Sequence, residues 1–232
     1  MDKMMPIIDV IIPAYNEQLS VALVVQEIPK DWVRTVVVVN NNSTDQTAQR
    51  AEEAGAIVLH QPIQGYGASC LMGIDYLSQQ ATPPEIIVFL DADHADYPDE
   101  IPKVVKPIID DEYHMVIGSR ALGVRERGSI TPQQIFGNWL ATWLLRLIYG
   151  YRFTDLGPFR AIRFQALQGL GMKDQNYGWT VEMQIKAAKQ KLKCTEVPVK
   201  YRKRIGVSKV SGTVKGTILA GYKIITTLFK YA

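Results

Sequence analysis

The sequence predicts an α/β fold built on a mostly parallel, Rossmann-like sheet with helices on both faces. Short runs rich in Val and Ile alternate with longer segments of helical periodicity through the first half of the chain. The short runs are almost continuously apolar, as strands are when both faces of a sheet are covered. With 232 residues, the chain has the length of one such unit with additions, so we expect a single domain over residues 1–232.

Strands and helices are expected to alternate up to about residue 120. Ser43 and Gln46 have the spacing of a capping box, and Gly55 is placed to end the helix that follows them. The expected strands are 7–12, 34–40, 56–60, 85–90 and 113–120, and the expected helices are 17–28, 43–55, 67–80 and 98–110.

The second half is less regular, and it forms an extension to the sheet. The residues from 123 to 133 are polar and predict a loop that carries or adjoins several arginines. Beyond this loop we expect a Trp-rich helix at 134–149, a turn at 155–163, a helix at 178–190, a strand at 194–201 and a final helix at about 212–230.

Composition excludes several classes of protein. No stretch reaches the roughly 18 uncharged apolar residues that a membrane span requires. Cys70 and Cys194 lie far apart in no metal-like spacing, which favours two reduced thiols over a disulfide. The start of the chain lacks the pattern of a signal peptide, so we expect a cytoplasmic location.

Positive charge is concentrated at the end of the chain. From Lys186 to Ala232 there are twelve Lys or Arg and one acid, Glu196. Nucleic acid, an anionic lipid surface and a phosphorylated substrate all fit this charge. A nucleic-acid partner is not expected, because the basic segment lacks interleaved aromatic residues arranged for stacking on bases.

Polar loops follow the expected strands and should gather along one rim of the sheet. Ligands of open α/β sheets bind beyond the carboxyl ends of the strands. The loops that this rule brings together are 13–17, 40–45, 64–67 and 91–96.

Asp91 and Asp93 directly follow the apolar run from Ile86 to Leu90. Residues i and i+2 of a strand face the same side, so both carboxylates can enter one crevice, where a divalent cation would relieve their repulsion. Mg²⁺ or Mn²⁺, held by one or two carboxylates and by phosphate oxygens, is the expected ion. The alternative is a solvated acidic turn before a helix that starts at Pro98.

These motifs occur in the order and spacing of a known family. "IIPAYNE" after the first strand, "NNNSTD" after the second, the pair Gly65 and Gly67, and "DAD" at 91–93 resemble the family 2 glycosyltransferases, which have the GT-A fold. The resemblance covers about residues 7–120 and implies a half of the domain that binds a nucleotide-diphosphate sugar. It implies inversion at the sugar carbon, a metal at Asp91 and Asp93, and donor-binding roles for Pro13, Ala14, Tyr15, Glu17, Asn40, Asn41, Gly65, Gly67, Asp91 and Ala92.

One departure concerns the base of the nucleotide. Many members of the family carry an acidic pair where this chain has Asn40 and Asn41. An Asn oxygen accepts a hydrogen bond as a carboxylate does, but its NH₂ group also donates one. The identity of the base is therefore open, and Asn42 can equally be a turn residue that tolerates a positive φ.

Residues beyond 112 resemble one branch of the family. "IGSR", "DLGPFRAIR", "GWTVEM" and "VKYRKRIGVSKVSG" are similar to the dolichyl-phosphate mannose and glucose synthases. This similarity implies that about 121–232 form an acceptor half that binds a polyprenyl phosphate, on the cytoplasmic face of a membrane as a peripheral protein. A separate membrane subunit or a homo-oligomer is compatible with it.

A phosphate acceptor gives the basic residues a task. A phosphate monoester is already anionic at neutral pH and needs cations to approach a diphosphate. The candidate acceptor-phosphate residues are Arg120, Arg160, Arg202, Arg204, Ser208 and Lys209. A solvated basic strand edge is the alternative, and which of Arg202, Lys203 and Arg204 contacts phosphate is open.

Glu182 and Asp155 are candidate catalytic residues, together with Asp93 and Arg120. Each of the two could be a general base for a hydroxyl acceptor, or could pair with a basic group such as Arg160. A hydroxyl-bearing soluble acceptor and a non-catalytic nucleotide-sugar sensor that docks on a membrane partner are the rival functions.

Two amphipathic helices complete the expectations. Apolar residues recur at helical spacing from Phe136 to Ile148 and again from Val214 to Phe229, where lysines occupy another face. Trp and Lys in this arrangement suit a membrane interface, whereas a place in the protein core is the alternative.

Overall fold

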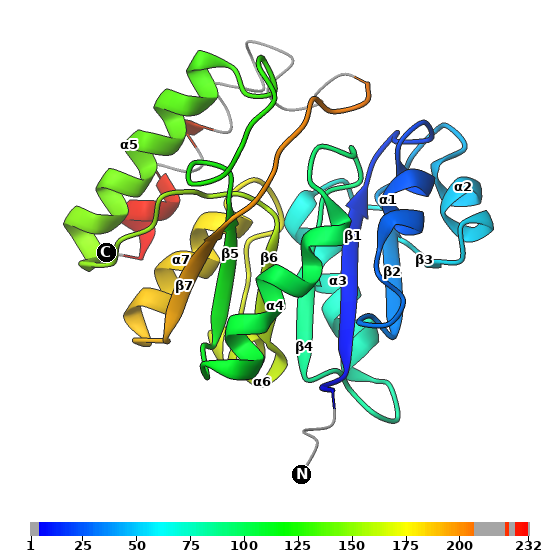
Figure 1. Cartoon of the computed structure of the whole chain (residues 1–232), viewed down its shortest axis with the longest axis horizontal. Coiled ribbons are helices and arrows are strands. Elements are labelled where there is room, and N and C mark those ends of the chain that lie inside the picture. Colours follow the sequence, from blue (N-terminus) through cyan, green and yellow to red (C-terminus); the bar gives the residue numbers. More distant parts are fainter. Residues whose placement is uncertain (1–4, 207–220, 223–225, 232) are drawn as a thin grey trace.

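The computed structural model describes residues 5–206, 221–222 and 226–231 (Figure 1). Its centre is a seven-stranded sheet with the order β3-β2-β1-β4-β6-β5-β7. The strands are β1 (Ile8–Ala14), β2 (Thr35–Asn40), β3 (Ile57–His60), β4 (Ile86–Phe89), β5 (Met115–Ser119), β6 (Arg160–Arg163) and β7 (Cys194–Pro198). The helices are α1 (Val21–Glu27), α2 (Thr47–Glu53), α3 (Tyr66–Ser78), η1 (Pro98–Glu100), α4 (Ile101–Asp110), α5 (Pro132–Tyr149), α6 (Phe164–Leu170) and α7 (Trp179–Lys189).

The predicted mostly parallel sheet is confirmed. β1 pairs in parallel with β2 and β4, β2 with β3, and β5 with β7. Among the strands of the described residues, β6 alone runs antiparallel to its neighbours, between β4 and β5. The sequence predicted a turn in this region, because β6 has only four residues and an arginine at each end. α6, which follows β6 directly, was also missed.

Helices cover both faces of the sheet and form two apolar cores with it. On one face, α1 and α4 pack on Val10 and Ile12 of β1. On the other face, α3, α5, α6 and α7 contribute to the core that contains Ile11 of the same strand. Burial on both faces explains why the strands are continuous runs of Val and Ile.

Helix α2 starts differently from the prediction. The capping box of Ser43 and Gln46 is absent, since the helix begins at Thr47 and Gln46 makes no side-chain cap. Ser43 instead accepts a hydrogen bond from the backbone N–H of Asn16 at 3.0 Å, which joins the loops after β1 and β2. Gly55 does end the segment, at a φ of +95° that a residue with a side chain rarely adopts.

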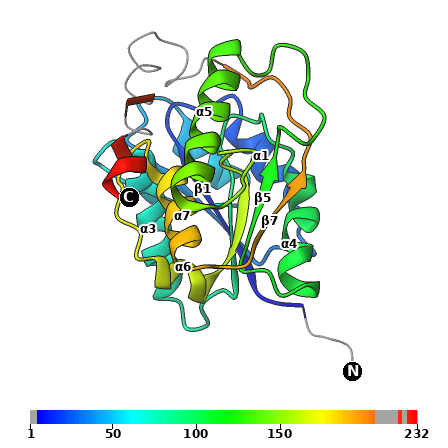
Figure 2. The same cartoon turned by 90° about the vertical axis from the view of Figure 1, so that its left-hand side faces the viewer.

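The end of the chain is anchored on α5 and α7 (Figure 2). Leu228 is fully buried, and its carbonyl accepts a hydrogen bond from the Tyr149 hydroxyl at 2.6 Å. Most of the expected final helix at 212–230, together with Ser208 and Lys209, lies outside the described residues. The expected strand at 194–201 is shorter than predicted and ends at Pro198.

Candidate active site

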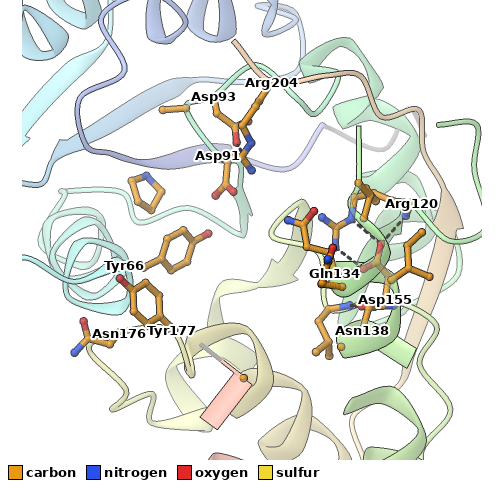
Figure 3. Close-up of a pocket in the computed structure, with 18 of the residues that line it drawn as sticks. Tyr66, Asp91, Asp93, Arg120, Gln134, Asn138, Asp155, Asn176, Tyr177 and Arg204 are labelled. Carbon is orange, nitrogen blue, oxygen red and sulfur yellow. Dashed lines mark hydrogen bonds and ion pairs between the residues drawn. The ribbon is translucent and has the colours of Figure 1, made fainter. Parts of the chain in front are cut away.

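A cavity of about 1150 Å³ opens at the carboxyl ends of β1, β4 and β5. Loops that the sequence predicted to meet at this rim line it, and α5 and the loop before α7 supply its remaining walls (Figure 3). The predicted site residues among its lining are Pro13, Ala14, Tyr15, Glu17, Asn41, Gly65, Asp91, Ala92, Asp93, Arg120, Asp155 and Arg204.

Asp91 and Asp93 both line the cavity, next to Arg204 (Figure 3). One carboxylate oxygen of Asp91, Oδ1, is buried and has no hydrogen-bond partner among the described residues. Burial, followed by the charge of Asp93, raises the pKa of Asp91 to about 7. Asp93 accepts a hydrogen bond from the backbone N–H of Ala95 at 2.9 Å and pairs with the Arg204 guanidinium at 3.0 Å.

These two carboxylates fit a Mg²⁺ or Mn²⁺ site of the kind that substrate completes. Within the described ranges, no group of three or more His, Cys, Asp and Glu side chains could hold a metal ion by itself. Magnesium in phosphate-transferring sites is commonly held by one or two carboxylates plus phosphate oxygens. The buried, unpartnered oxygen of Asp91 is a ready ligand for such an ion.

The loop after β1 forms the end of the cavity predicted for the nucleoside, with Pro13, Ala14, Tyr15 and Glu17 in its lining. A contact with the first residue of α2 and one with the N-cap residue of α1 fix its shape. The backbone N–H of Glu17 donates to Thr47 Oγ1 at 2.7 Å, and the Glu17 carboxylate accepts from Ser20 Oγ at 2.9 Å.

Asn40 and Asn41 occupy different places. Asn41 lines the cavity, but its amide is engaged with the loop before α3: Nδ2 donates to the Ile63 carbonyl at 2.8 Å and Oδ1 accepts from the Gly65 N–H at 2.7 Å. Asn40 is not part of the lining, and its side chain contacts His60 and the Ser43 N–H. A direct contact of Asn40 with the nucleotide therefore lacks geometric support.

The two glycines permit a close approach of α3 to the loop before α7. A Cβ on Gly65 would lie 2.2 Å from the Gln175 carbonyl oxygen, and one on Gly67 would lie 2.0 Å from the Asp174 carbonyl oxygen. Gly65 lines the cavity, whereas Gly67 does not. Gly67 therefore affects the site through packing. It lets α3 approach the loop before α7, and that loop places Asn176 and Tyr177 in the wall of the cavity.

Gly67→Ala is expected to destabilise the protein by about 1–3 kcal/mol, since the loop must move to admit the new methyl group. The KM for the donor should rise more than kcat falls, because Asn176 and Tyr177 move with the loop. Thermal melting and donor titrations measure both effects. Gly169→Ala on α6, where the nearest atom is 3.9 Å away, is the matched control and should be neutral or slightly stabilising. Equal behaviour of the two variants would contradict this account.

Arg120 and Asp155 form a buried ion pair on the wall formed by α5 and the loop that follows it (Figure 3). Arg120 donates to Asp155 from its backbone N–H at 2.7 Å, from Nε at 2.8 Å and from Nη2 at 2.6 Å. Burial opposes ionisation of Asp155, but the charge and hydrogen bonds of Arg120 outweigh it and lower the pKa of the carboxyl. Asp155 is thus held as the counter-ion of Arg120, which does not support its use as a general base.

The basic segment after β7 points in two directions. Arg204 reaches the aspartates, whereas Arg202 pairs with Glu27 at 2.6 Å and stacks over the Tyr97 ring at 4.3 Å. Lys203 lies at the surface, 3.8 Å from Glu126. Among these three, the described structure brings only Arg204 into the cavity, so the predicted contact of Arg202 with phosphate lacks support.

Glu182 and Arg160 also lie outside the cavity lining. Glu182 is fully buried and accepts hydrogen bonds from the Asp174 N–H at 2.7 Å and from the Tyr231 hydroxyl at 2.7 Å, beside an ion pair with Lys186 at 2.8 Å. It therefore organises the loop before α7 and the chain end, and its candidate role as a base has no geometric support. The alternative expectation was a pairing with a basic group such as Arg160, and the basic group found beside Glu182 is Lys186.

Arg160 is fully buried within the sheet, where its guanidinium donates to backbone carbonyls, including that of Thr180 at 3.1 Å. Burial lowers the pKa of Arg160 to about 10. A contact between this side chain and an acceptor phosphate is not supported, because the group is satisfied inside the protein.

Sequence reasoning missed several polar residues of the cavity. Tyr66 points its hydroxyl toward Asp91 from the wall opposite Arg120, next to Tyr177 (Figure 3). That hydroxyl is buried without a hydrogen-bond partner in the described structure. On the other wall, Asn138 of α5 donates to the Thr154 carbonyl at 2.8 Å and accepts from the Leu156 N–H at 2.9 Å. The proximity of Tyr66 to the Gly65–Gly67 pair was the only available signal.

One wall of the cavity is apolar and continues onto an exposed face of α5. The apolar lining residues here are Ile130, Ile135, Trp139, Phe153 and Leu156. Along the outside of α5, four large residues at helical spacing are exposed, namely Phe136 (61%), Trp139 (56%), Trp143 (48%) and Leu147 (68%). These four members of the predicted stripe are therefore not core, whereas Leu144 is half-buried and packs on the core together with the buried Leu145. Over the described part of the chain, no helix is long and apolar enough to cross a membrane.

Comparison with known proteins assigns the family. A family model described as glycosyl transferase family 2 matches residues 9–171. A glycosyltransferase of Mycobacterium tuberculosis is 33% identical over 214 residues, which are 92% of this chain and 94% of the relative. The chain therefore belongs to glycosyl transferase family 2, as the sequence motifs predicted.

Two further relatives are named for polyprenyl phosphates. The chain is 28% identical to the UDP-N-acetylglucosamine–dolichyl-phosphate N-acetylglucosaminyltransferase of Methanococcus voltae, over 96% of this chain and 94% of that enzyme. It is 27% identical to the undecaprenyl-phosphate mannosyltransferase of Micrococcus luteus, over 89% and 88%.

The fold also matches a solved structure. Glucosyl-3-phosphoglycerate synthase from Mycobacterium tuberculosis, crystallised with Mn²⁺, UDP-glucose and phosphoglyceric acid, superposes with a TM-score of 0.77 at 22% sequence identity. The match covers 97% of this chain and 79% of the synthase. The GT-A-like α/β fold expected from the sequence is thereby confirmed.

Proposed function

We propose that this family 2 glycosyltransferase transfers a hexose from a nucleotide-diphosphate sugar to a polyprenyl phosphate at a membrane surface. The observation that carries the proposal is the continuity of one cavity. At one part of this cavity lie two carboxylates suited to a metal and a diphosphate, with Arg120 and Arg204 also in the lining. The same cavity has an apolar wall that continues into the exposed aromatic face of α5.

The carboxylates of the described cavity favour an acceptor that is already anionic. Asp91 and Asp93 are assigned to the metal, Asp155 is neutralised by Arg120, and Glu17 lies in the loop expected to bind the nucleoside. A hydroxyl acceptor needs a base to remove its proton, whereas a phosphate monoester, with a second pKa near 6, does not. The two polyprenyl-phosphate relatives support the same choice.

The proposed chemistry is a displacement at the anomeric carbon with inversion. An oxygen of the acceptor phosphate forms the new bond to the sugar, the bond from the sugar to the donor diphosphate breaks, and the nucleoside diphosphate leaves with that electron pair. When bound, Mg²⁺ or Mn²⁺ offsets the charge on the leaving diphosphate. Asp91 and Asp93 would hold that ion, and Arg120, whose position Asp155 fixes, would orient the acceptor phosphate.

The exposed face of α5 is the proposed contact with the membrane. Its aromatic residues lie against one another, with ring centroids 5.8 Å apart for Phe136 and Trp139 and 6.4 Å for Trp139 and Trp143. Such amphipathic helices lie in the interface of a bilayer with Trp and Phe at the boundary of the acyl chains. The protein would then be a peripheral protein on the cytoplasmic face of the membrane. It could act there as a monomer, as a homo-oligomer or together with a membrane subunit.

The double variant Phe136→Gln, Trp143→Gln is expected to bind anionic lipid vesicles about tenfold more weakly, or weaker still. In the wild type both apolar side chains would transfer from water into the lipid interface, and the variant loses the free energy of that transfer. Vesicle sedimentation measures the binding. Ile57→Gln is the matched control, since Ile57 is 40% exposed on edge strand β3, away from α5 (Figure 1). A double variant that binds vesicles as the wild type does would rule out α5 as the membrane contact.

The assay for the function offers radiolabelled nucleotide-sugars with and without a polyprenyl phosphate, in the presence of Mg²⁺ or Mn²⁺. Label in the organic extract, dependent on the polyprenyl phosphate, is the expected result. Label only in a water-soluble product would overturn the lipid acceptor in favour of a soluble one. Binding of nucleotide-sugar without turnover of any acceptor would favour a sensor.

A further inference from the structure

Arg204 occupies the position of a cation at the proposed metal site. Its guanidinium lies 3.0 Å from Asp93 Oδ2, and its side chain is 28% exposed against 6% for that of Asp93. The negative charge of Asp93 is therefore neutralised from within the chain.

The backbone that carries Arg204 is held by hydrogen bonds to the loops after β4 and after β5. The Arg202 N–H donates to the Ala95 carbonyl at 2.9 Å, and the Ile205 N–H donates to the Asp93 carbonyl at 3.0 Å. The Tyr201 N–H donates to the Val124 carbonyl at 3.0 Å. The guanidinium can consequently change partner by side-chain rotation while the segment from 201 to 205 stays in place.

A divalent cation at this site would compete with the Arg204 guanidinium for Asp93. A metal ion bound by both carboxylates takes the charge that the guanidinium now neutralises, and it repels the guanidinium at close range. A phosphate group changes this balance, because its oxygens provide ligands for the metal and a bidentate partner for the displaced arginine. Metal and phosphate should therefore bind together much better than the metal binds alone.

We propose that Arg204 is an internal counter-cation that competes with the metal for Asp93 and exchanges this carboxylate for phosphate oxygens when substrate binds. The exchange makes metal binding depend on substrate. It also delivers the arginine to phosphate only after the metal has entered. This inference rests on the metal-assisted donor binding proposed above and concerns the role of one residue in it.

The test measures binding of Mn²⁺ alone, by calorimetry or by the electron paramagnetic resonance signal of the free ion. Arg204→Gln is expected to bind Mn²⁺ about tenfold more tightly than the wild type, because the competitor is gone. The same variant, freed of metal by EDTA, should melt at a lower temperature and recover on addition of Mn²⁺. Arg204→Lys keeps the charge and should retain weak Mn²⁺ binding. Lys203→Gln, which removes the neighbouring surface cation near Glu126, should bind Mn²⁺ as the wild type does.

Two further titrations distinguish the source of the phosphate. Mn²⁺ binding is repeated with saturating nucleoside diphosphate, as UDP or GDP, and with geranyl phosphate as a short acceptor. The ligand that tightens Mn²⁺ binding in the wild type, and does so less in Arg204→Gln, is the one whose phosphate receives the arginine. Mn²⁺ affinity that is unchanged or weakened in Arg204→Gln overturns the inference. Absence of Mn²⁺ binding by the wild type in every mixture instead overturns the proposed metal-assisted function.

Discussion

Asp91→Asn is expected to lower turnover by at least about a hundredfold. The substitution removes a charged ligand of the metal, so the metal is held less well and offsets less of the charge on the leaving diphosphate. The same substitution should stabilise the metal-free protein at pH 8. A loss of activity together with a gain of stability is expected for a carboxylate that binds a ligand and destabilises the folded protein when that ligand is absent.

The sign of the stability effect follows from the pKa of Asp91, which is raised from 3.8 to about 7. Below pH 4 the carboxyl is protonated in both the folded and the unfolded chain and has no pH-dependent effect. Between pH 4 and 7 the unfolded chain releases this proton while the folded one retains it, so the free energy of unfolding falls as the pH rises. An Asn side chain does not titrate, so the variant does not lose stability in this way. The difference in the free energy of unfolding between Asp91→Asn and the wild type should therefore be larger at pH 8 than at pH 5.

Thermal melting in EDTA at the two pH values measures this difference, and steady-state assays with added metal measure turnover. Asp99→Asn is the matched control, since Asp99 is exposed on η1, eight residues further along the chain, and should affect neither quantity. Turnover close to that of the wild type, or lower stability of Asp91→Asn at pH 8, would contradict the assigned role.

Asp155→Asn is expected to destabilise the protein by about 3–5 kcal/mol, because it leaves the charge of Arg120 without its buried partner. For a chain of this length each kcal/mol lowers the melting temperature by roughly 2–4 °C. The loss of orientation of Arg120 should also raise the KM for the acceptor phosphate while the KM for the donor stays nearly constant.

Asp9→Asn separates the two effects. Asp9 is a fully buried partner of Arg34 in a second bidentate pair, at the start of β1 and away from the cavity. This variant should lose stability in the same direction but keep the wild-type KM for both substrates. If Asp155→Asn and Asp9→Asn have the same kinetic profile, Asp155 is a structural residue and has no part in positioning Arg120.

The sequence predicted the parts of the fold that local pattern determines. Continuous Val and Ile in β1, β2 and β4 marked the strands, and the polar loops behind them marked the rim. β6 escaped prediction because its pairing partners are distant and its own four residues include two arginines. The burial of Arg160 could not be foreseen, since it depends on carbonyls from two other segments.

The choice among basic residues was open for a related reason. Arg202 and Arg204 are two residues apart, so a continued strand would place both side chains on one face of the sheet. β7 ends at Pro198, and the segment beyond it directs Arg202 to Glu27 and Arg204 to Asp93. Two roles stayed open for Glu182, because Tyr231, one of its partners, is 49 residues away in the sequence.

The most direct measurement of the central claim is an anomalous difference map from crystals grown with Mn²⁺ and a nucleotide-diphosphate sugar. We predict one manganese peak within bonding distance of Asp91 or Asp93 and of the diphosphate, with Arg204 no longer on Asp93. Diphosphate density in the cavity without a manganese peak at these aspartates would contradict it.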